Sequence, residues 1–232
     1  MAMVKKGKSN KISSVRSENF LLTEKAPFAM QEAYKTLRTN VMLSLPGGDC
    51  KCLGITSACP GDGKSTTSTN LAIALAQIGK RVLLVDCDLR LPTVAAKLRI
   101  PGVPGLSDFL AGQARIEDAV RKHEHFGIHV LPAGTIPPDP TGLLESAQMG
   151  HLIAALKKIY DYVIFDLPPV TTVADAAILA KYIDGYLLVT HINRTEHRKV
   201  AEMLRQMQMA DANVLGFVTT GGAVSGSYYY KR

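Results

Sequence analysis

The sequence predicts an α/β domain with a doubly wound, mostly parallel sheet and helices on both faces. Three observations lead to this fold class: short runs rich in Val, Ile and Leu recur, helical segments alternate with them, and most runs are apolar at consecutive positions. Strands that are apolar on both faces are typical of a parallel sheet, because crossover helices cover each side of it.

The expected elements follow in order. A helix is expected to begin at Pro27, which suits a first helical position, and to stop before Pro46. The first strand is expected at residues 51–57, followed by a helix over 65–80 that ends near Gly79. A second strand at 81–88 and short helical pieces within 93–121 come next. Further strands are expected at 127–132, 162–167, 185–190 and 214–220, and further helices at 147–160, 173–183 and 195–210.

Length and composition fit one large domain. The chain has 232 residues, of which 47% are hydrophobic, and this is enough for one core. We expect a basic arm over residues 1–26, the folded domain over 27–225 and a tyrosine-rich tail over 226–232. No apolar run approaches the roughly 20 residues of a membrane span, and the basic start lacks the apolar centre of a signal peptide. The expected location is cytoplasmic.

The charge and the cysteines exclude some classes of protein. The net charge is +7, and much of the excess lies in the first 16 residues. This arm either binds an anionic partner such as lipid or is a solvated tail, and the absence of interleaved aromatic residues argues against nucleic acid. The cysteines have no spacing typical of disulfide frameworks or zinc sites, so reduced thiols are expected. They are Cys50, Cys52, Cys59 and Cys87.

A glycine-rich loop, SACPGDGKST, follows the first strand and precedes a helix. Backbone N–H groups in such a loop converge on phosphate, helped by the helix dipole. Lys64 can reach the β- and γ-phosphates of ATP, and the Ser65 hydroxyl can ligate Mg²⁺. Ala58 stands where the usual pattern begins with Gly. The residues expected to bind nucleotide are Pro60, Gly61, Asp62, Gly63, Lys64, Ser65 and Thr66, which indicates a P-loop NTPase type of domain.

Carboxylates follow two other strands. Asp86 and Asp88 lie two residues apart and so face the same side, and Asp166 ends the run YVIFD. Carboxylates beside a triphosphate are suited to Mg²⁺, directly or through water. We expect Mg·ATP to bind here, with Ser65, Asp88 and Asp166 as the metal site.

These motifs resemble those of the bacterial tyrosine kinase (BY-kinase) family, over roughly residues 27–232. The sequence SACPGDGKS resembles its Walker A motif, LLVDCDLR its Walker A′ motif and VIFDLPP its Walker B motif. The resemblance implies an ATP-dependent tyrosine autokinase of capsular and exopolysaccharide synthesis, in its separate-chain form. It also implies a catalytic core of Lys64, Asp86 and Asp166, with Asp86 orienting the acceptor hydroxyl.

The resemblance further implies an oligomer and its acceptor residues. The family helix motif Glu-x-x-Arg-x-x-Arg, which joins subunits into a ring, appears here as Glu32, Lys35 and Arg38. Lysine replaces the first arginine and loses its planar fork, and an intrahelical pair on a solvated face is the alternative reading. The expected ring, with an octamer as its candidate size, forms from unphosphorylated chains. The expected phosphoacceptors are Tyr228, Tyr229 and Tyr230.

The implied partners are a transmembrane polysaccharide co-polymerase that activates the kinase at the inner face of the membrane, and a cognate phosphotyrosine phosphatase. Thr220 stands where family members often carry an Asn that reads adenine. Two other functions stay open: an ATP-driven partition or positioning switch, and a nucleotide-gated scaffold. Switch proteins carry a second lysine where this loop has Cys59, which argues against that class.

Overall fold

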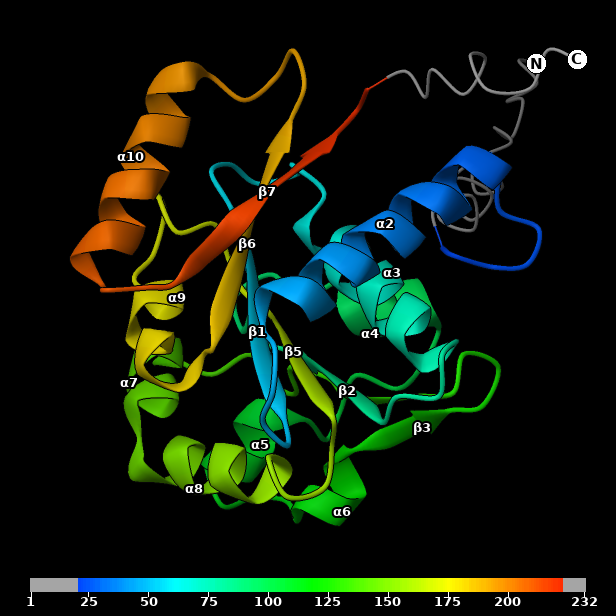
Figure 1. Ribbon diagram of the computed structural model, residues 1–232. Helices are drawn as coiled ribbons and strands as arrows, with labels where there is room; N and C mark the ends of the chain where they lie inside the picture. The colour runs from blue at the N-terminus through cyan, green and yellow to red at the C-terminus, as the bar shows by residue number, and fades with distance from the viewer. Residues whose placement is uncertain (1–20, 223–232) are drawn as a thin grey trace, which may run out of the picture.

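The computed structural model describes residues 21–222, which form a seven-stranded sheet between two layers of helices (Figure 1). The strand order is β3-β4-β2-β5-β1-β6-β7, with an antiparallel β3–β4 pair at one edge and parallel pairs elsewhere. This confirms the predicted fold class. The strands are β1 Lys51–Ser57, β2 Val82–Asp86, β3 Arg121–His123, β4 Ile128–Leu131, β5 Tyr162–Asp166, β6 Gly185–His191 and β7 Val214–Thr220.

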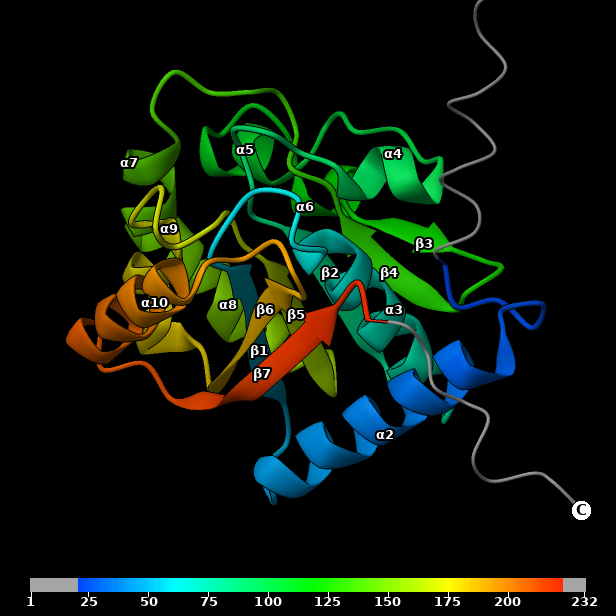
Figure 2. The same ribbon diagram turned by 90° about the horizontal axis from the view of Figure 1, so that it is seen from above.

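Helices cover both faces of the sheet, with α2, α3 and α4 on one side and α7 to α10 on the other (Figures 1 and 2). Alternate strand residues serve the two layers: Leu53 and Ile55 of β1 face α3, whereas Cys52 faces the opposite cluster. Within residues 21–222, no helix has the length and apolarity needed to cross a membrane. The helices are α2 Phe28–Ser44, α3 Lys64–Ala76, α4 Val94–Leu98, α5 Leu106–Leu110, α6 Ile116–Ala119, α7 Pro140–Glu145, α8 Ala147–Leu156, α9 Asp175–Ile178, the 3₁₀ helix η1 Ala180–Tyr182 and α10 His197–Met209.

One observed element was not expected, and two expected helices differ from those observed. The edge strand β3 was not expected, because its residues are Arg, Lys and His, and polar edge strands carry no apolar pattern. The helix expected at 147–160 ends at Leu156, beyond which Lys158 and Ile159 donate to the third residue back rather than the fourth. The helix expected at 173–183 divides into α9 and η1.

The packed part of the chain begins before Pro27. Leu22 is 3% exposed within the apolar layer under α2 and α3, and its N–H donates to Asn70 Oδ1 at 2.8 Å. Residues 21–26, which the sequence assigned to the basic arm, therefore continue the domain. The isolated Leu21-Leu22 pair gave too short a pattern to show this burial.

Candidate active site

The phosphate-binding loop and the candidate carboxylates meet at one edge of the sheet. β5 lies between β1 and β2, so the carboxyl ends of these three strands are neighbours. Asp86 and Asp166 are paired in register across β2 and β5, and the loop that follows Ser57 begins beside them. Open parallel sheets bind ligands at this edge. The fold thus brings together the residues that the sequence placed in one site.

The loop between β1 and α3 borders a cavity of about 350 Å³. Gly61 has φ 81° and Gly63 has φ 101°, backbone conformations that glycine adopts without the steric penalty of a side chain. Such conformations turn successive N–H groups toward one point. Six of the seven residues expected to bind nucleotide line this cavity: Pro60, Gly61, Gly63, Lys64, Ser65 and Thr66.

Lys64 lies between two carboxylates. Its Nζ is 2.8 Å from Asp88 Oδ2 and 3.8 Å from Asp166 Oδ2. Burial by itself would lower the pKa of Lys64, but the negative charges of Asp166 and Asp88 outweigh it and raise this pKa. Lys64 is therefore held as a cation at the floor of the cavity.

Asp86 is fully buried beside this pair. Its Oδ2 accepts the N–H groups of Thr93 and Val94 at the start of α4, and its Oδ1 accepts the N–H of Asp88. Burial, together with the charge of Asp166, raises the pKa of Asp86 to about 7. The carboxylate thus fixes α4, while Asp88 rather than Asp86 lines the cavity.

Asp166 has the chemistry of a metal ligand. Within the described part of the chain, both of its carboxylate oxygens are buried and lack a hydrogen-bond partner. Burial raises the pKa of Asp166, and the charge of Lys64 opposes this effect. A Mg²⁺ ion would satisfy these oxygens, since it is usually held by one or two carboxylates together with substrate phosphates. The residues that would hold it are Ser65, Asp88 and Asp166, and the ion would neutralise phosphate charge.

Asp62 supports the loop from behind. Its side chain is fully buried and accepts the Cys59 N–H at 2.9 Å and the Thr195 hydroxyl at 3.0 Å. Its main-chain carbonyl accepts the Thr220 hydroxyl at 2.6 Å. Asp62 is therefore a positioning residue rather than a lining one. The sequence did not indicate Thr195, because its partner is distant along the chain.

We expect Asp62→Ala to weaken ATP binding by about ten- to a hundredfold, since small displacements of a phosphate loop have effects of this size. The half-buried Cys59 N–H and Thr195 hydroxyl would lose their acceptor, which lowers the free energy of unfolding by about 1–3 kcal/mol. Calorimetric ATP titration and urea denaturation measure the two effects. Asp118→Ala, an exposed change of the same type, should alter neither.

Arg90 connects the site to the opposite helical layer, a role that no sequence pattern indicated. Its guanidinium donates to Thr141 Oγ1 at 2.8 Å and lies 3.4 Å from buried Asp175 Oδ1. Arg90 also lines the nucleotide cavity. This contact ties the loop after β2 to α7 and α9.

The residues of the expected subunit interface have contacts within the chain. Lys35 Nζ is 2.7 Å from Glu32 Oε1 on the exposed face of α2, as the alternative reading expects. Arg38 donates to the Ala74 carbonyl at 2.9 Å, near the end of α3, where a cation is favourable. The expected phosphoacceptors, Tyr228 to Tyr230, lie outside the described residues.

The sequence of this chain is similar to a protein family and to two curated tyrosine kinases. Residues 50–214 match the family described as an AAA domain. The chain is 41% identical to the tyrosine-protein kinase YwqD of Bacillus subtilis, over 84% of this chain and 82% of that one. It is 39% identical to the tyrosine-protein kinase CpsD of Streptococcus agalactiae, over 81% of each.

Solved structures show the same fold. The chimerical protein CapA2B2 superposes with a TM-score of 0.82 at 32% identity, covering 91% of each chain. The septum site-determining protein MinD of Pyrococcus horikoshii, solved as a complex with Mg-ADP, has a TM-score of 0.62 at 27% identity over 73% of this chain and 70% of that one. The P-loop fold is thus shared with a division-site protein, whereas the two relatives from Bacillus subtilis and Streptococcus agalactiae, aligned over 84% and 81% of this chain, are tyrosine-protein kinases. The chain belongs to the bacterial tyrosine kinase (BY-kinase) family.

Proposed function

We propose that this protein is a Mg·ATP-dependent tyrosine kinase of capsular and exopolysaccharide synthesis. The observation that carries the proposal is the buried group of Lys64, Asp88 and Asp166, in which Lys64 and Asp88 line the P-loop cavity and Asp166 lies behind them. A cation and metal-ligating carboxylates at this point suit the transfer of a γ-phosphoryl group, which depends on positioning and charge stabilisation.

In this proposal the loop N–H groups of residues 61–66 and the Lys64 ammonium bind the β- and γ-phosphates. Lys64 exchanges its contact with Asp88 for phosphate oxygen. A bond forms between the tyrosine oxygen and the γ-phosphorus, and the bond from that phosphorus to the oxygen of ADP breaks. Asp86 is our candidate to orient the phenol and accept its proton, because a base with a pKa near neutral suits this task. In the nucleotide-free chain its oxygens accept backbone N–H groups instead, so this role requires the acceptor hydroxyl to displace the contacts with Thr93 and Val94.

The acceptors in this proposal are Tyr228, Tyr229 and Tyr230 of a neighbouring subunit. The last strand, β7, ends at Thr220, whose hydroxyl contacts the phosphate loop. The six residues from 223 to 228 extend at most about 22 Å, and a return into the chain's own cavity demands a tight reversal. Transfer between subunits of a ring avoids this reversal, and the phosphorylated tails, carrying about −1.5 to −2 charge per phosphate, then loosen the ring.

The proposed setting is the cytoplasmic side of a membrane. A transmembrane polysaccharide co-polymerase recruits and activates the kinase, and a phosphotyrosine phosphatase reverses its product. The basic residues Lys5 to Arg16 add attraction to the anionic surface.

A mixing experiment tests transfer between subunits. Lys64→Met chains lack the transferring cation but keep their tyrosines, whereas chains with Tyr228, Tyr229 and Tyr230 changed to Phe keep the site but lack acceptors. Each alone should stay unlabelled with [γ-³²P]ATP, and the mixture should label the Lys64→Met chain, as phosphotyrosine mass spectrometry would show. Wild-type labelling beside an unlabelled mixture would place transfer within one chain.

A further inference from the structure

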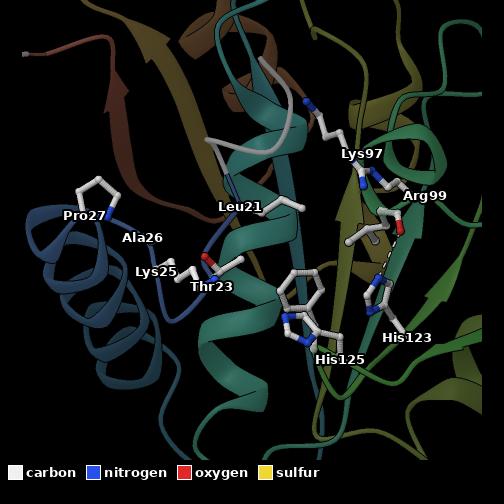
Figure 3. Close-up of a pocket in the computed structure, with 11 residues that line it drawn as sticks. Leu21, Thr23, Lys25, Ala26, Pro27, Lys97, Arg99, His123 and His125 are labelled. Carbon is white, nitrogen blue, oxygen red and sulfur yellow. Dashed lines mark hydrogen bonds between the residues drawn. The ribbon is translucent and has the colours of Figure 1, made fainter. Parts of the chain in front are cut away.

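A second cavity, of about 760 Å³, lies beside the start of the domain. It is enclosed by residues 21–27, the end of α4 and the turn between β3 and β4 (Figure 3). Of the described residues that line it, none is acidic, and five carry a cationic or imidazole side chain. These five are Lys25, Lys97, Arg99, His123 and His125.

Lys97 belongs to this cavity and to the nucleotide cavity. The Lys97 side chain is partly buried. Among the described residues 21–222, its ammonium group has no hydrogen-bond or ion-pair partner. Burial lowers the pKa of Lys97, and the charge of Asp166 opposes this effect. A partly desolvated cation without a contacting carboxylate favours the approach of an anion.

The turn between β3 and β4 supplies a fixed aromatic wall. His123 Nε2 is 3.2 Å from the Leu98 carbonyl, and the His123 ring stacks on Phe126 at 4.7 Å between centroids. His125 meets the same ring edge-on at 4.8 Å. Figure 3 shows the bond from His123 to the end of α4, with Lys25 and Thr23 across the cavity. Imidazole and lysine side chains therefore line the cavity together with apolar residues.

The size of the cavity points to an organic phosphate. Cavities of roughly 300–1,000 Å³ are typical of sites for small molecules, and a free phosphate ion would leave most of this one empty. Five of the eleven described residues that line the cavity are apolar: Leu21, Ala26, Pro27, Leu98 and Phe126. A phosphate ester of an aromatic alcohol would match this wall, because its charged group suits the cationic side chains and its ring suits the apolar ones.

We propose that this cavity binds phosphotyrosine, with the phosphoryl oxygens on Lys97 and Lys25 and the phenyl ring against Phe126 and Leu98. Arg99, which also has contacts elsewhere, adds positive charge to the wall of this cavity. The choice of ligand rests on the proposed tyrosine kinase function, because that reaction makes this ester, but binding does not require catalysis. Charge-assisted hydrogen bonds to phosphate are strong enough to select the ester over tyrosine.

The test is an NMR titration of the full chain, saturated with Mg·ADP to fill the nucleotide site. N-acetyl-O-phosphotyrosine amide should shift the amide signals of residues 21–27, 97–99 and 123–126, whereas N-acetyltyrosine amide should not. Lys97→Gln and Lys25→Gln should each weaken binding by about tenfold, the loss typical of one charged hydrogen bond. Lys158→Gln, an exposed change on another face of the molecule, should bind as the wild type does.

Three results would overturn the proposal. Equal affinity for inorganic phosphate would make the cavity a site for free anions, and shifts confined to residues 60–66 would place the ester in the nucleotide loop. An absence of shifts would exclude binding. Lys25 is exposed, so Lys25→Gln keeps the test valid even if Lys97→Gln perturbs α4.

Discussion

Lys64→Met should lower tyrosine phosphorylation by about a thousandfold or more, since removing one preorganised group that stabilises transition-state charge has effects of this order. Methionine has nearly the length of lysine and fits a side chain that is 8% exposed. The change therefore removes the charge with little change of volume. Phosphotyrosine mass spectrometry after incubation with ATP measures the loss.

The same substitution should destabilise the nucleotide-free protein. Asp88 and Asp166 would lose the cation that lies 2.8 and 3.8 Å from their oxygens. Leaving buried carboxylates without a partner lowers the free energy of unfolding by about 3 kcal/mol. Because burial raises the pKa of Asp166, this carboxyl can take up a proton instead, and the loss should be larger at pH 8 than at pH 5.

Lys158→Met controls for the loss of one positive charge, and it should leave phosphorylation and stability unchanged. Undiminished phosphorylation in Lys64→Met, with a folded protein confirmed by circular dichroism, would contradict the assignment of this site. A loss of phosphorylation with equal thermal stability at pH 5 and pH 8 would show that the Lys64 contacts are not those of the structure.

The sequence predicted the layout of the fold and the site because both follow from local patterns. Apolar runs identify β1, β2 and β5, and parallel strands place their carboxyl ends together, so Lys64 and Asp166 could be joined before any contact was known. The polar edge strand β3 lacks such a pattern. Its position depends on pairing with β4, which is a tertiary interaction.

Supporting contacts could not be predicted in the same way. The hydroxyl groups of Thr195 and Thr220 reach Asp62 across more than 130 residues of sequence. Threonine near the end of a strand is common and by itself indicates nothing. The sequence placed Asp62 among the nucleotide-binding residues by its position in the motif, whereas the structure shows that its side chain positions the loop.

Asp86→Asn should lose most of the phosphorylation activity and yet stabilise the nucleotide-free protein at pH 8. Asparagine cannot accept the phenol proton, so transfer should fall by about a hundredfold or more. Nucleotide binding should remain, because Asp86 does not line the cavity. Phosphotyrosine mass spectrometry and calorimetric ADP titration measure the two properties.

The stability effect follows from the raised pKa. The pKa of Asp86 is about 7 in the folded chain against an ordinary 3.8. Between these values the folded state keeps a proton that the unfolded state has released, so the free energy of unfolding falls as pH rises from about 4 to 7. Asparagine carries no charge, and like a protonated carboxyl it keeps one full acceptor oxygen for the α4 N–H groups.

The difference in stability between Asp86→Asn and wild type should therefore be small at pH 4.5 and favour the variant at pH 8, as urea denaturation at both pH values would show.

Asp161→Asn supplies a control of opposite sign. Arg81 donates to this carboxylate at 2.7 Å and lowers its pKa, so its contribution is present above pH 4 and is lost as pH falls. Asp161→Asn should thus be less stable than wild type at pH 8. If Asp86→Asn were also less stable at pH 8, the Asp86 carboxylate would be bound favourably as an anion, and its role as a base of near-neutral pKa would be wrong.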